Sequence, residues 1–437
     1  MTTPRKSTNP TAQAIDRFCA QFDDLYCRVS ERQAFRQYLI GLLLPREHNK
    51  TLTVLSSLVP GANTQRLHHF VHDSPWDCDA VNARRLSLWQ QHRALGPHPG
   101  GVLIVDETGD RKRGHGIELA ANQYIGKLGH TANGVVSVTS HWSDGTRHVP
   151  LGVRAYRPKS RLPLGQADPR FHTKPELAWE LIEEARKAGV PFRVVVADCV
   201  YGESPKLEQR LYRAKLKYIL ALRPNKGTWQ LVEDEQHPPA FTPAEAAQRV
   251  PIPRSQRTVH TDSHGKELVR YVAELELGPY YGPQKSARLI AATEDPEKLK
   301  AENTWYMSTN LSVQQASTPE VYDLYRLRDW IEHYYKPAKH ELGWADFQMR
   351  KERAIVRHWQ LVMLAFTFSL LEGVEPEEIG GTDRERTEES GGKIWSPYSL
   401  ERYAEAHQEL AMPVGAHDPL LAKLVHCTSS NRAGSPA

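Results

Sequence analysis

The chain has 437 residues, of which 40% are apolar and 25% are charged. That balance is typical of a folded globular protein and excludes fully disordered and fibrous classes. The length suggests about three domains, or one large domain with additions, at roughly 150 residues each. The net charge of +4 is too small to indicate a nucleic-acid partner by itself. The five cysteines are scattered without a CxxC pair and indicate neither a zinc knuckle nor a disulfide framework.

The N-terminus, MTTPRKSTNP, has no apolar core, and no run of 18 apolar residues occurs in the chain. We therefore expect neither a signal peptide nor a transmembrane helix, and a cytoplasmic protein without a membrane partner. Residues 1–12 are polar and are expected to be disordered.

Residues 13–95 have apolar residues at helical spacing, so 1–95 is predicted to be a helical N-terminal domain. Within it, TLTVLSSLVPGANTQRLHHFVHD predicts two short helices around a Pro-Gly turn. This pattern is compatible with a helix-turn-helix whose second helix, carrying Arg66, enters a major groove of DNA. Any small helical bundle would give a similar pattern, so the sequence leaves DNA contact by Arg66 open.

The next region changes to an α/β pattern. Strands are predicted at 101–108, 134–142 and 149–156, then a helix at 174–189, a strand at 192–199, another helix and a strand at 216–223. The turn dipeptide Asp144-Gly145 joins the second and third strands. Three strands followed by helix, strand, helix, strand is the order of a ribonuclease-H-like fold.

The remaining sequence predicts a β-rich insertion at 224–304, followed by a strand at 305–310 and a helical stretch from 319 to about 372. The catalytic core would then comprise 96–223 and 305–372. A linker and C-terminal tail would follow at 373–437, with a flexible segment at 375–393 and one helix at 399–411.

Two apolar runs lead directly into an aspartate, namely VLIV before Asp106 and VVVA before Asp198. A carboxylate at the end of a buried strand is costly unless it is solvated, paired or bound to a cation. A strand leaving the core into a loop would give the same pattern. However, these strands are the first and fourth of the predicted sheet and neighbours in the ribonuclease-H-like order, so the carboxylates are expected to converge.

A two-metal site for phosphoryl transfer needs two or three acids, because Mg²⁺ prefers carboxylate oxygens. The third candidate is Glu332. Tyr325, Arg328, Glu332 and Lys339 lie at offsets 0, 3, 7 and 14, and at about 100° per residue they share one helical face. Pro337 is expected to interrupt that helix. The alternative is a solvated, charged helix without a ligand.

The spacing Y-x2-R-x3-E-x6-K of these four residues resembles the signature of a branch of DDE insertion-sequence transposases. The resemblance covers roughly residues 100–370, and Asp106, Asp198 and Glu332 match the family's D, D and E in order. A β insertion before the Glu is a family trait. The segments VDETG, NQYIGKLG and HHFVHDSPWD also resemble one bacterial insertion-sequence subgroup. Pro337, between the Glu and the Lys, departs from the pattern and bears on the orientation of Lys339.

The resemblance implies a cut-and-paste transposase that acts as a homodimer on DNA with terminal inverted repeats and joins the cleaved ends to target DNA. It implies two Mg²⁺ ions, for which Mn²⁺ can substitute, held by the three acids, and DNA contacts from Tyr325, Arg328 and Lys339. It also implies association with the nucleoid. In family members that form hairpins, a flipped base stacks on a tryptophan, and Trp305 is the matching position. The alternative for Trp305 is a buried strand tryptophan.

Several other side chains allow two interpretations. Arg350 and Lys351, with Arg353 and Arg357, could bind phosphates or form a solvated face, and the same holds for Lys112 and Arg113. His68, His69 and His72 lack partners for a metal site, and Cys199 and Glu107 should point away from the two aspartates, with Cys199 in the core.

Two other functions compete with a transposase. One is a ribonuclease-H-like nuclease without strand transfer. The other is a domesticated DNA-binding regulator, against which the presence of all three acids argues.

Overall fold

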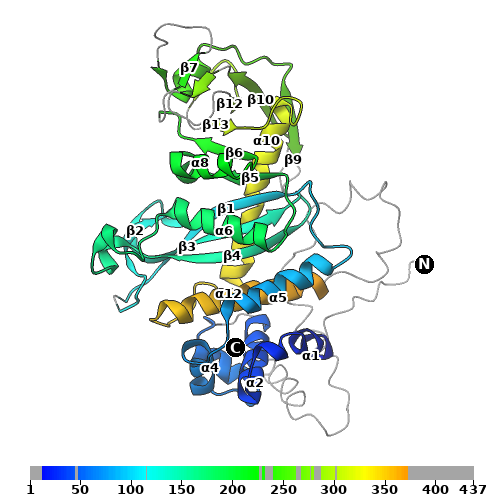
Figure 1. Cartoon of the computed structure of the whole chain (residues 1–437), viewed down its shortest axis with the longest axis vertical. Helices are drawn as coiled ribbons and strands as arrows, with labels where there is room; N and C mark the ends of the chain where they lie inside the picture. Colours follow the sequence, from blue (N-terminus) through cyan, green and yellow to red (C-terminus); the bar gives the residue numbers. More distant parts are fainter. Residues whose placement is uncertain are drawn as a thin grey trace, which may run out of the picture.

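A computed structural model describes residues 12–44, 48–114, 116–225, 229–231, 240–261, 267–275, 277–279, 287–300 and 303–372. The predicted flexible segment at 375–393 and the helix at 399–411 lie outside these residues. The molecule is elongated, with the N-terminal helices at one end, a twisted sheet across the middle and the insertion strands at the other end (Figure 1).

The N-terminal region contains the two short helices predicted around the Pro-Gly turn. Thr51 caps the first by accepting a hydrogen bond from Val54 N, and Asn63 caps the second by accepting from Gln65 N and Arg66 N. The helices of this region are α1 (Ala12–Ala20), α2 (Val29–Leu43), α3 (Leu52–Leu58), α4 (Thr64–His72) and α5 (Cys78–Gln91).

The central sheet has the strand order expected of a ribonuclease-H-like fold. β4, β3 and β1 are antiparallel neighbours, and β5 and β6 follow β1 in parallel. A strand that was not predicted, β2, pairs with the first half of β3. The strands are β1 (Val102–Arg111), β2 (Ala121–Ile125), β3 (His130–Ser143), β4 (His148–Tyr156), β5 (Val194–Ala197) and β6 (Tyr218–Leu222).

Strands of the predicted insertion, together with the strand predicted at 305–310, extend this same sheet. β13 pairs with β6, and β12, β10 and β9 follow in antiparallel order. Three short strands, β7, β8 and β11, form a separate small sheet. These elements are β7 (Trp229–Leu231), β8 (Ala240–Phe241), α9 (Pro243–Ala247), β9 (Arg257–Thr261), β10 (Glu267–Leu275), β11 (Leu277–Pro279), β12 (Arg288–Thr293) and β13 (Thr304–Thr309).

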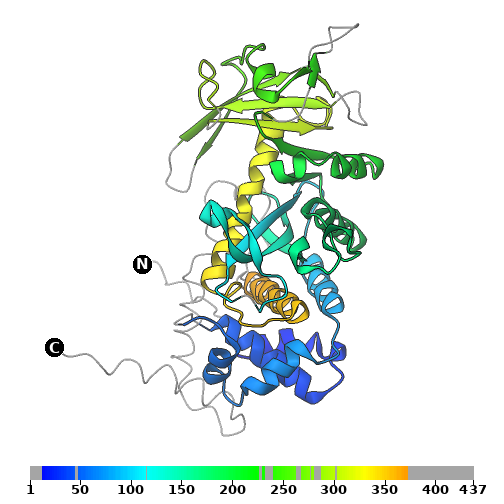
Figure 2. The same cartoon turned by 90° about the vertical axis from the view of Figure 1, so that its left-hand side faces the viewer.

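Helices cover both faces of the central sheet (Figure 2). One face packs on α6 (Lys174–Lys187), α7 (Cys199–Gly202) and α8 (Pro205–Arg213). The other packs on α10 (Thr318–Arg326), the 3-10 helix η5 (Leu327–Ile331), α11 (Glu332–His340) and α12 (Glu352–Glu372). Shorter 3-10 helices are η1 (Asp23–Leu25), η2 (Gly126–Leu128), η3 (Lys159–Arg161) and η4 (Gly165–Ala167).

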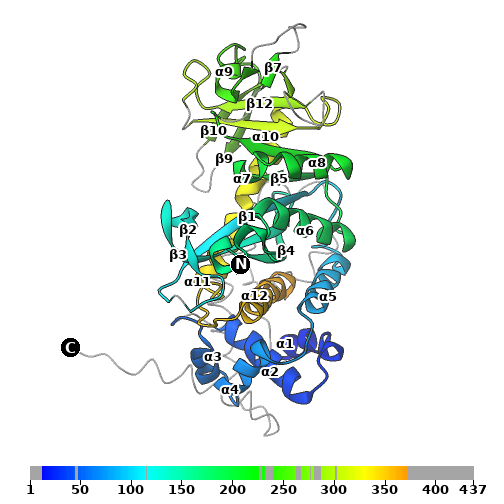
Figure 3. The same cartoon turned by 60° about the vertical axis from the view of Figure 1, so that its left-hand side comes forward.

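The helical stretch predicted from 319 to 372 is therefore not continuous. Its first part, α10, η5 and α11, runs as one rod across the sheet (Figures 1 and 3). Helix α10 contacts β10, β12, β6 and β5. The 3-10 helix η5 contacts β1, and α11 contacts β4. The chain then turns at Gly343, which has a φ of +76°, and begins α12 only at Glu352.

Helix α12 joins the N-terminal helices to the sheet. It is long and apolar enough to cross a membrane by length and composition, but 83% of its most apolar window is buried inside the protein. It packs against α2, α4 and α5 on one side and β4 on the other. Among the described residues, it is the one helix that passes this test, and it is a core helix.

A fully buried arginine stabilises the same junction. Arg85 of α5 donates hydrogen bonds to the carbonyls of Pro150 (2.7 Å) and Leu151 (2.8 Å) on β4 and to Thr367 Oγ1 (2.9 Å) on α12. Its guanidinium replaces the water that these buried carbonyls would otherwise need.

We predict that Arg85→Ala lowers the free energy of unfolding by about 3 kcal/mol, because it removes the buried side chain and its hydrogen bonds to the carbonyls of Pro150 and Leu151 and to Thr367. Arg84→Ala is the matched control, since Arg84 is a neighbour whose ion pair with Asp24 lies at the surface. Arg84→Ala should lower the free energy of unfolding by less than about 1 kcal/mol. Urea unfolding of both variants measures the difference, and equal losses would contradict the role given to Arg85.

Candidate active site

The two predicted aspartates lie where strands β1 and β5 separate. The parallel pairing of these strands ends with Val105 opposite Ala197, and Asp106 and Asp198 are the next residues on each chain segment. The prediction that the two strands are neighbours is confirmed. The prediction that Asp106 ends its strand is wrong, because β1 continues to Arg111 as a partner of β3 alone.

Asp198 does not continue a strand but caps a short helix. Its Oδ1 accepts a hydrogen bond from Val200 N at 2.9 Å, and α7 begins at the following residue, Cys199. The alternation of side chains along a strand therefore does not apply to Cys199. That cysteine is half-buried and lies outside the hydrophobic core, so its predicted place in the core is wrong.

Asp106 is a nearly buried carboxylate with a cationic partner. Its Oδ2 accepts a hydrogen bond from Arg328 Nη1 at 2.6 Å, and its Oδ1 accepts one from Glu107 N at 2.7 Å. Burial raises the pKa of Asp106 to about 7; the Arg328 guanidinium lowers it and the charge of Asp198 raises it. The two aspartates are thus close enough to repel each other, and a cation between them would relieve that repulsion.

Glu107 lies on the opposite face of β1, as predicted. Its carboxylate accepts hydrogen bonds from Lys174 Nζ and, at 3.0 Å, from Tyr201 OH. Lys174 belongs to α6 and Tyr201 to α7, so Glu107 faces the helices of the other layer. It is therefore separated from Arg328 by the sheet.

The rod of α10, η5 and α11 carries the four signature residues and is called the signature helix below; it crosses the sheet on the Asp106 face of β1 and contacts that strand at two points. Arg328 binds Asp106, and Lys339 binds Asp110 (Nζ to Oδ1, 2.7 Å) and the carbonyl of Gly109 (3.2 Å). Pro337 does not end the helix, since α11 continues to His340. The predicted interruption is wrong, and Lys339 shares the β1-facing side with Arg328.

Glu332 begins α11, one turn after Arg328 in the same row of side chains. Its side chain is exposed, and among the described residues it has no hydrogen-bond or ion-pair partner. The structure therefore brings Asp106, Asp198 and Arg328 together, with Glu332 on the adjoining helix and not in contact with them.

The residues that could hold a metal offer only oxygen ligands. Within the part of the chain that the structure describes, no group of three His, Cys, Asp or Glu side chains lies at metal-binding distance. The paired carboxylates of Asp106 and Asp198 are the ligand type that Mg²⁺ and Mn²⁺ prefer. The donor set thus fits a hard divalent cation rather than zinc.

The remaining signature residue, Tyr325, is buried on α10. Its ring lies 5.9 Å from the Arg328 guanidinium, and burial raises its pKa to about 12. Tyr325 therefore packs beside Arg328 and supports its position.

Trp305 lies on β13, opposite Ala292 of β12. It is half-buried, with the Arg270 guanidinium 5.0 Å from its ring and the Tyr322 ring 6.4 Å away. One side of the indole is thus already stacked on a cation.

The four basic residues around the start of α12 do not form one surface. Arg357 is buried and donates hydrogen bonds to the carbonyls of Phe70, Val71 and Trp76. This geometry excludes a phosphate contact by Arg357 and gives it a structural role. Arg353 donates to the carbonyl of Ser74 at 3.0 Å.

The other two basic residues, with Arg66, lie at the surface or partly so. Lys351 is 70% exposed and pairs with Glu118 at 2.9 Å, and Arg350 is exposed beside Gly116. Arg66 of α4 donates to Gln37 Oε1 at 3.0 Å and to the carbonyl of Gly61, so it holds the turn before its own helix. His68 and His72 stack on each other at 3.8 Å on the exposed side of α4.

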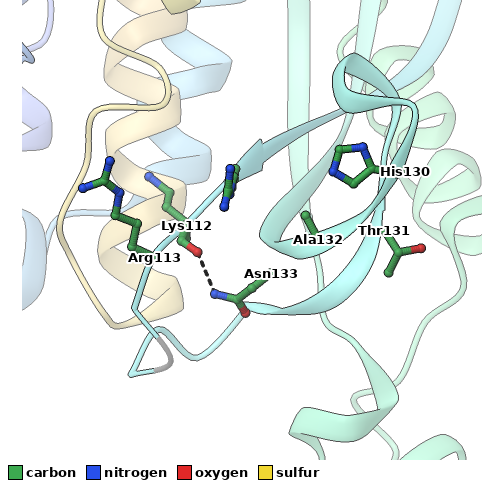
Figure 4. A pocket seen from close by; sticks show the side chains of 7 residues that line it. Lys112, Arg113, His130, Thr131, Ala132 and Asn133 are labelled. Atoms are coloured by element: carbon green, nitrogen blue, oxygen red, sulfur yellow. Dashed lines mark hydrogen bonds between the residues drawn. The ribbon is translucent and has the colours of Figure 1, made fainter.

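A basic pocket lies at the far end of β1 (Figure 4). Its volume is about 460 Å³, and the hydrogen bond from Asn133 Nδ2 to the carbonyl of Lys112, 2.7 Å, joins its two walls. The sequence analysis had named Lys112 and Arg113 as possible phosphate contacts, but it predicted neither Arg111 nor the opposite wall. The lining residues are Arg111, Lys112, Arg113, His130, Thr131, Ala132 and Asn133.

The three cations of this pocket differ in their surroundings. Lys112 Nζ donates to the carbonyls of Ala345 (2.7 Å) and Phe347 (3.1 Å), and burial lowers its pKa to about 8. Arg111 and Arg113 have no ion-pair partner among the described residues. These two side chains are the ones that remain available to a ligand.

The sheet order and the paired aspartates are consistent with a ribonuclease-H-like nuclease. Residues 18–273 match the family model described as "DDE superfamily endonuclease". A protein of Microchaete diplosiphon, "Probable transposase for insertion sequence element IS701", is 35% identical over 351 residues, covering 80% of this chain and 85% of that protein. The chain therefore belongs to the DDE endonuclease superfamily. The range matched by the family model contains Asp106 and Asp198 and ends before Glu332.

The double role of Asp198, as helix cap and as charged group, leads to a prediction for the metal-free protein. Asp198→Asn keeps an oxygen that accepts from Val200 N and removes the repulsion with Asp106, so its free energy of unfolding should equal or exceed that of the wild type. Asp198→Ala removes the cap and should cost about 1 kcal/mol. Urea unfolding in EDTA compares the two, and equal destabilisation would show that the cap does not stabilise the fold.

Proposed function

We propose that this protein is the transposase of an insertion sequence, which cleaves DNA at the ends of the element and joins them to target DNA. The observation that carries the proposal is that Asp106 and Asp198 lie where β1 and β5 separate, with the signature helix held against β1 by Arg328 and Lys339. The likeness to a protein named as an insertion-sequence transposase supports it.

In this proposal Asp106, Asp198 and Glu332 hold two Mg²⁺ ions, for which Mn²⁺ can substitute. When bound, the ions supply the polarisation of the scissile phosphate and the activation of the attacking hydroxyl. Arg328 pairs with Asp106 in the metal-free protein and favours the ionised form of this buried carboxylate. Glu332, exposed and without a partner among the described residues, can turn toward the two aspartates.

The proposed partner is double-stranded DNA bearing terminal inverted repeats, bound by a homodimer, together with target DNA, in the cytoplasm and associated with the nucleoid. Arg328 and Lys339, supported by Tyr325, would position the cleaved strand. Trp305 would stack a flipped base on its side away from Arg270.

Basic residues farther from the acids would bind the duplex. Arg66 on α4, and Arg350 and Lys351 before α12, are proposed to contact DNA through their exposed portions. The pocket around Arg111 supports a path for the duplex along β1. Five residues at about 3.3 Å each separate Asp106 from Arg111, roughly 16 Å. This span matches about five nucleotides of one strand at about 3.4 Å each.

The test combines purified protein, a labelled DNA end, a target plasmid and Mg²⁺. Joined products support a transposase, and cleavage without joining would instead support a ribonuclease-H-like nuclease. Binding without cleavage by the wild type would support the DNA-binding regulator. EDTA should abolish both cleavage and joining.

Replacing any of the three acids, as Asp106→Asn, Asp198→Asn or Glu332→Gln, should reduce cleavage and joining to background while a gel shift still shows bound DNA ends. The reason is that each variant removes a metal ligand but no phosphate contact. Asp329→Asn is the matched control, because Asp329 is an exposed acid three residues before Glu332. It should keep its activity, and a Glu332→Gln variant that also does so would remove Glu332 from the site.

The pocket predicts a change in the salt dependence of DNA binding. Each lost phosphate contact lowers the log–log slope of affinity against salt by about 0.9 for duplex DNA, so Arg111→Ala with Arg113→Ala should lower it by about 1.8. The control is Arg254→Ala, an exposed arginine outside the pocket that pairs with Glu297. An unchanged slope in the double variant would mean that the pocket does not bind the duplex.

A further inference from the structure

A chain of buried hydrogen bonds connects β4 to the signature helix. His148 Nε2 lies 3.0 Å from His141 Nδ1, and His141 Nε2 lies 2.8 Å from Thr139 Oγ1. Thr139 Oγ1 lies 2.5 Å from the hydroxyl of Tyr335, on α11. All four side chains are buried, and Thr139 and His141 are fully so. The chain thus passes through β3 to the helix that begins with Glu332.

The protonation of this chain follows from its surroundings. Burial lowers the pKa of His141 well below its ordinary value and that of His148 to about 3, so both rings are neutral. A neutral ring has one donor and one acceptor nitrogen. His148 Nδ1 has no partner among the described residues, which suits its lone pair and places the proton on Nε2. His148 Nε2 then donates to His141 Nδ1, and His141 Nε2 donates to Thr139 Oγ1, which is also hydrogen-bonded to the Tyr335 hydroxyl.

Packing alone does not account for this chain. A helix lying on a sheet is stabilised by apolar contacts, and a buried polar group costs free energy unless it is hydrogen-bonded. A satisfied polar network, in contrast, favours one arrangement of its elements over shifted ones. A shift of one residue along α11 would move Tyr335 by about 1.5 Å and turn it by about 100°, which breaks its bond to Thr139.

The chain ends beside the candidate active site. Thr139 is the residue of β3 opposite Asp106, and its Oγ1 lies 3.5 Å from the Asp106 carbonyl oxygen. Tyr335 lies one helical turn after Glu332, between the contacts that Arg328 and Lys339 make with β1. The Tyr335 hydroxyl therefore fixes the position of α11 along its axis, and its rotation about that axis, next to Asp106.

We infer that Tyr335 is a positioning residue for the proposed metal site. Through Thr139 and the two histidines, it holds α11 where the Glu332 carboxylate can share a cation with Asp106 and Asp198. The inference rests on the proposed function, because it assigns Glu332 to the metal. It adds a residue outside the Tyr-Arg-Glu-Lys signature and gives a function to two buried histidines.

The neighbouring Tyr334 provides a matched control. It lies on the same helix and is fully buried, but its hydroxyl has no hydrogen-bond partner among the described residues. Tyr335→Phe and Tyr334→Phe thus each remove one buried oxygen, and only the first variant breaks a hydrogen bond to β3.

The experiment titrates Mn²⁺ into the full-length protein bound to a DNA end and measures free Mn²⁺ by electron paramagnetic resonance. Tyr335→Phe should weaken Mn²⁺ binding about tenfold, as losses of residues that orient metal ligands do. The Mn²⁺ concentration for half-maximal cleavage should rise by the same factor, with the rate recovering at saturating metal. Tyr334→Phe should match the wild type in both measurements.

An unchanged Mn²⁺ affinity in Tyr335→Phe, with or without a lower melting temperature, would overturn the inference. The hydrogen-bonded side chains would then serve only to stabilise the core. If Tyr335→Phe fails to fold, Thr139→Val and Thr139→Ser replace it. Valine lacks the hydroxyl and should weaken Mn²⁺ binding, whereas serine keeps it and should not. A wild-type protein that binds no Mn²⁺ and cleaves no DNA would instead refute the proposed function itself.

Discussion

The ion pair between Asp106 and Arg328 joins the signature helix to the central sheet. Asp106 is buried because the apolar residues before it form the middle of the sheet, and a buried carboxylate is unfavourable without a positive partner. That partner comes from a residue 222 positions later in the chain. Arg328 holds one point of its helix on β1, and Lys339, 11 residues later, binds Asp110 of the same strand. The signature spacing is thus the spacing of two cations along one acidic strand.

The sequence was most informative where burial alone determines structure. Apolar runs gave β1 and β5, and their order along the chain predicted that the two would be neighbours. The hydrophobicity pattern did not predict the strand segments that are stabilised by pairing with a neighbouring strand rather than by burial. The polar second half of β1 is held by hydrogen bonds to β3, and a residue-by-residue pattern of hydrophobicity carries no signal for that. The same reason explains the unpredicted β2 and the extension of the sheet by β9, β10, β12 and β13.

Buried arginines were beyond sequence analysis for a related reason. Arg357 is one of four basic residues in an eight-residue stretch, which is typical of a solvated or phosphate-binding surface. Its actual partners are the carbonyls of Phe70, Val71 and Trp76, more than 280 positions away. Arg85 satisfies the carbonyls of β4 in the same way. In both cases the backbone leaves acceptors unpaired where a helix or strand meets α12, and a guanidinium is long and flat enough to reach them.

The candidate site combines two fixed acids with one that is not yet engaged. Asp106 and Asp198 directly follow the last paired residues of β1 and β5, so the pairing of these strands brings their backbones close together. Glu332 is placed by a helix, and its side chain is exposed to solvent. Burial raises the pKa of Asp106, repulsion from Asp198 adds to that rise, and a third carboxylate held beside them without a cation would add to it further. In the proposed metal site, an exposed Glu332 avoids that repulsion before a cation binds, while the helix contacts at Asp106, Thr139 and Asp110 hold the backbone of α11 beside β1 and β3.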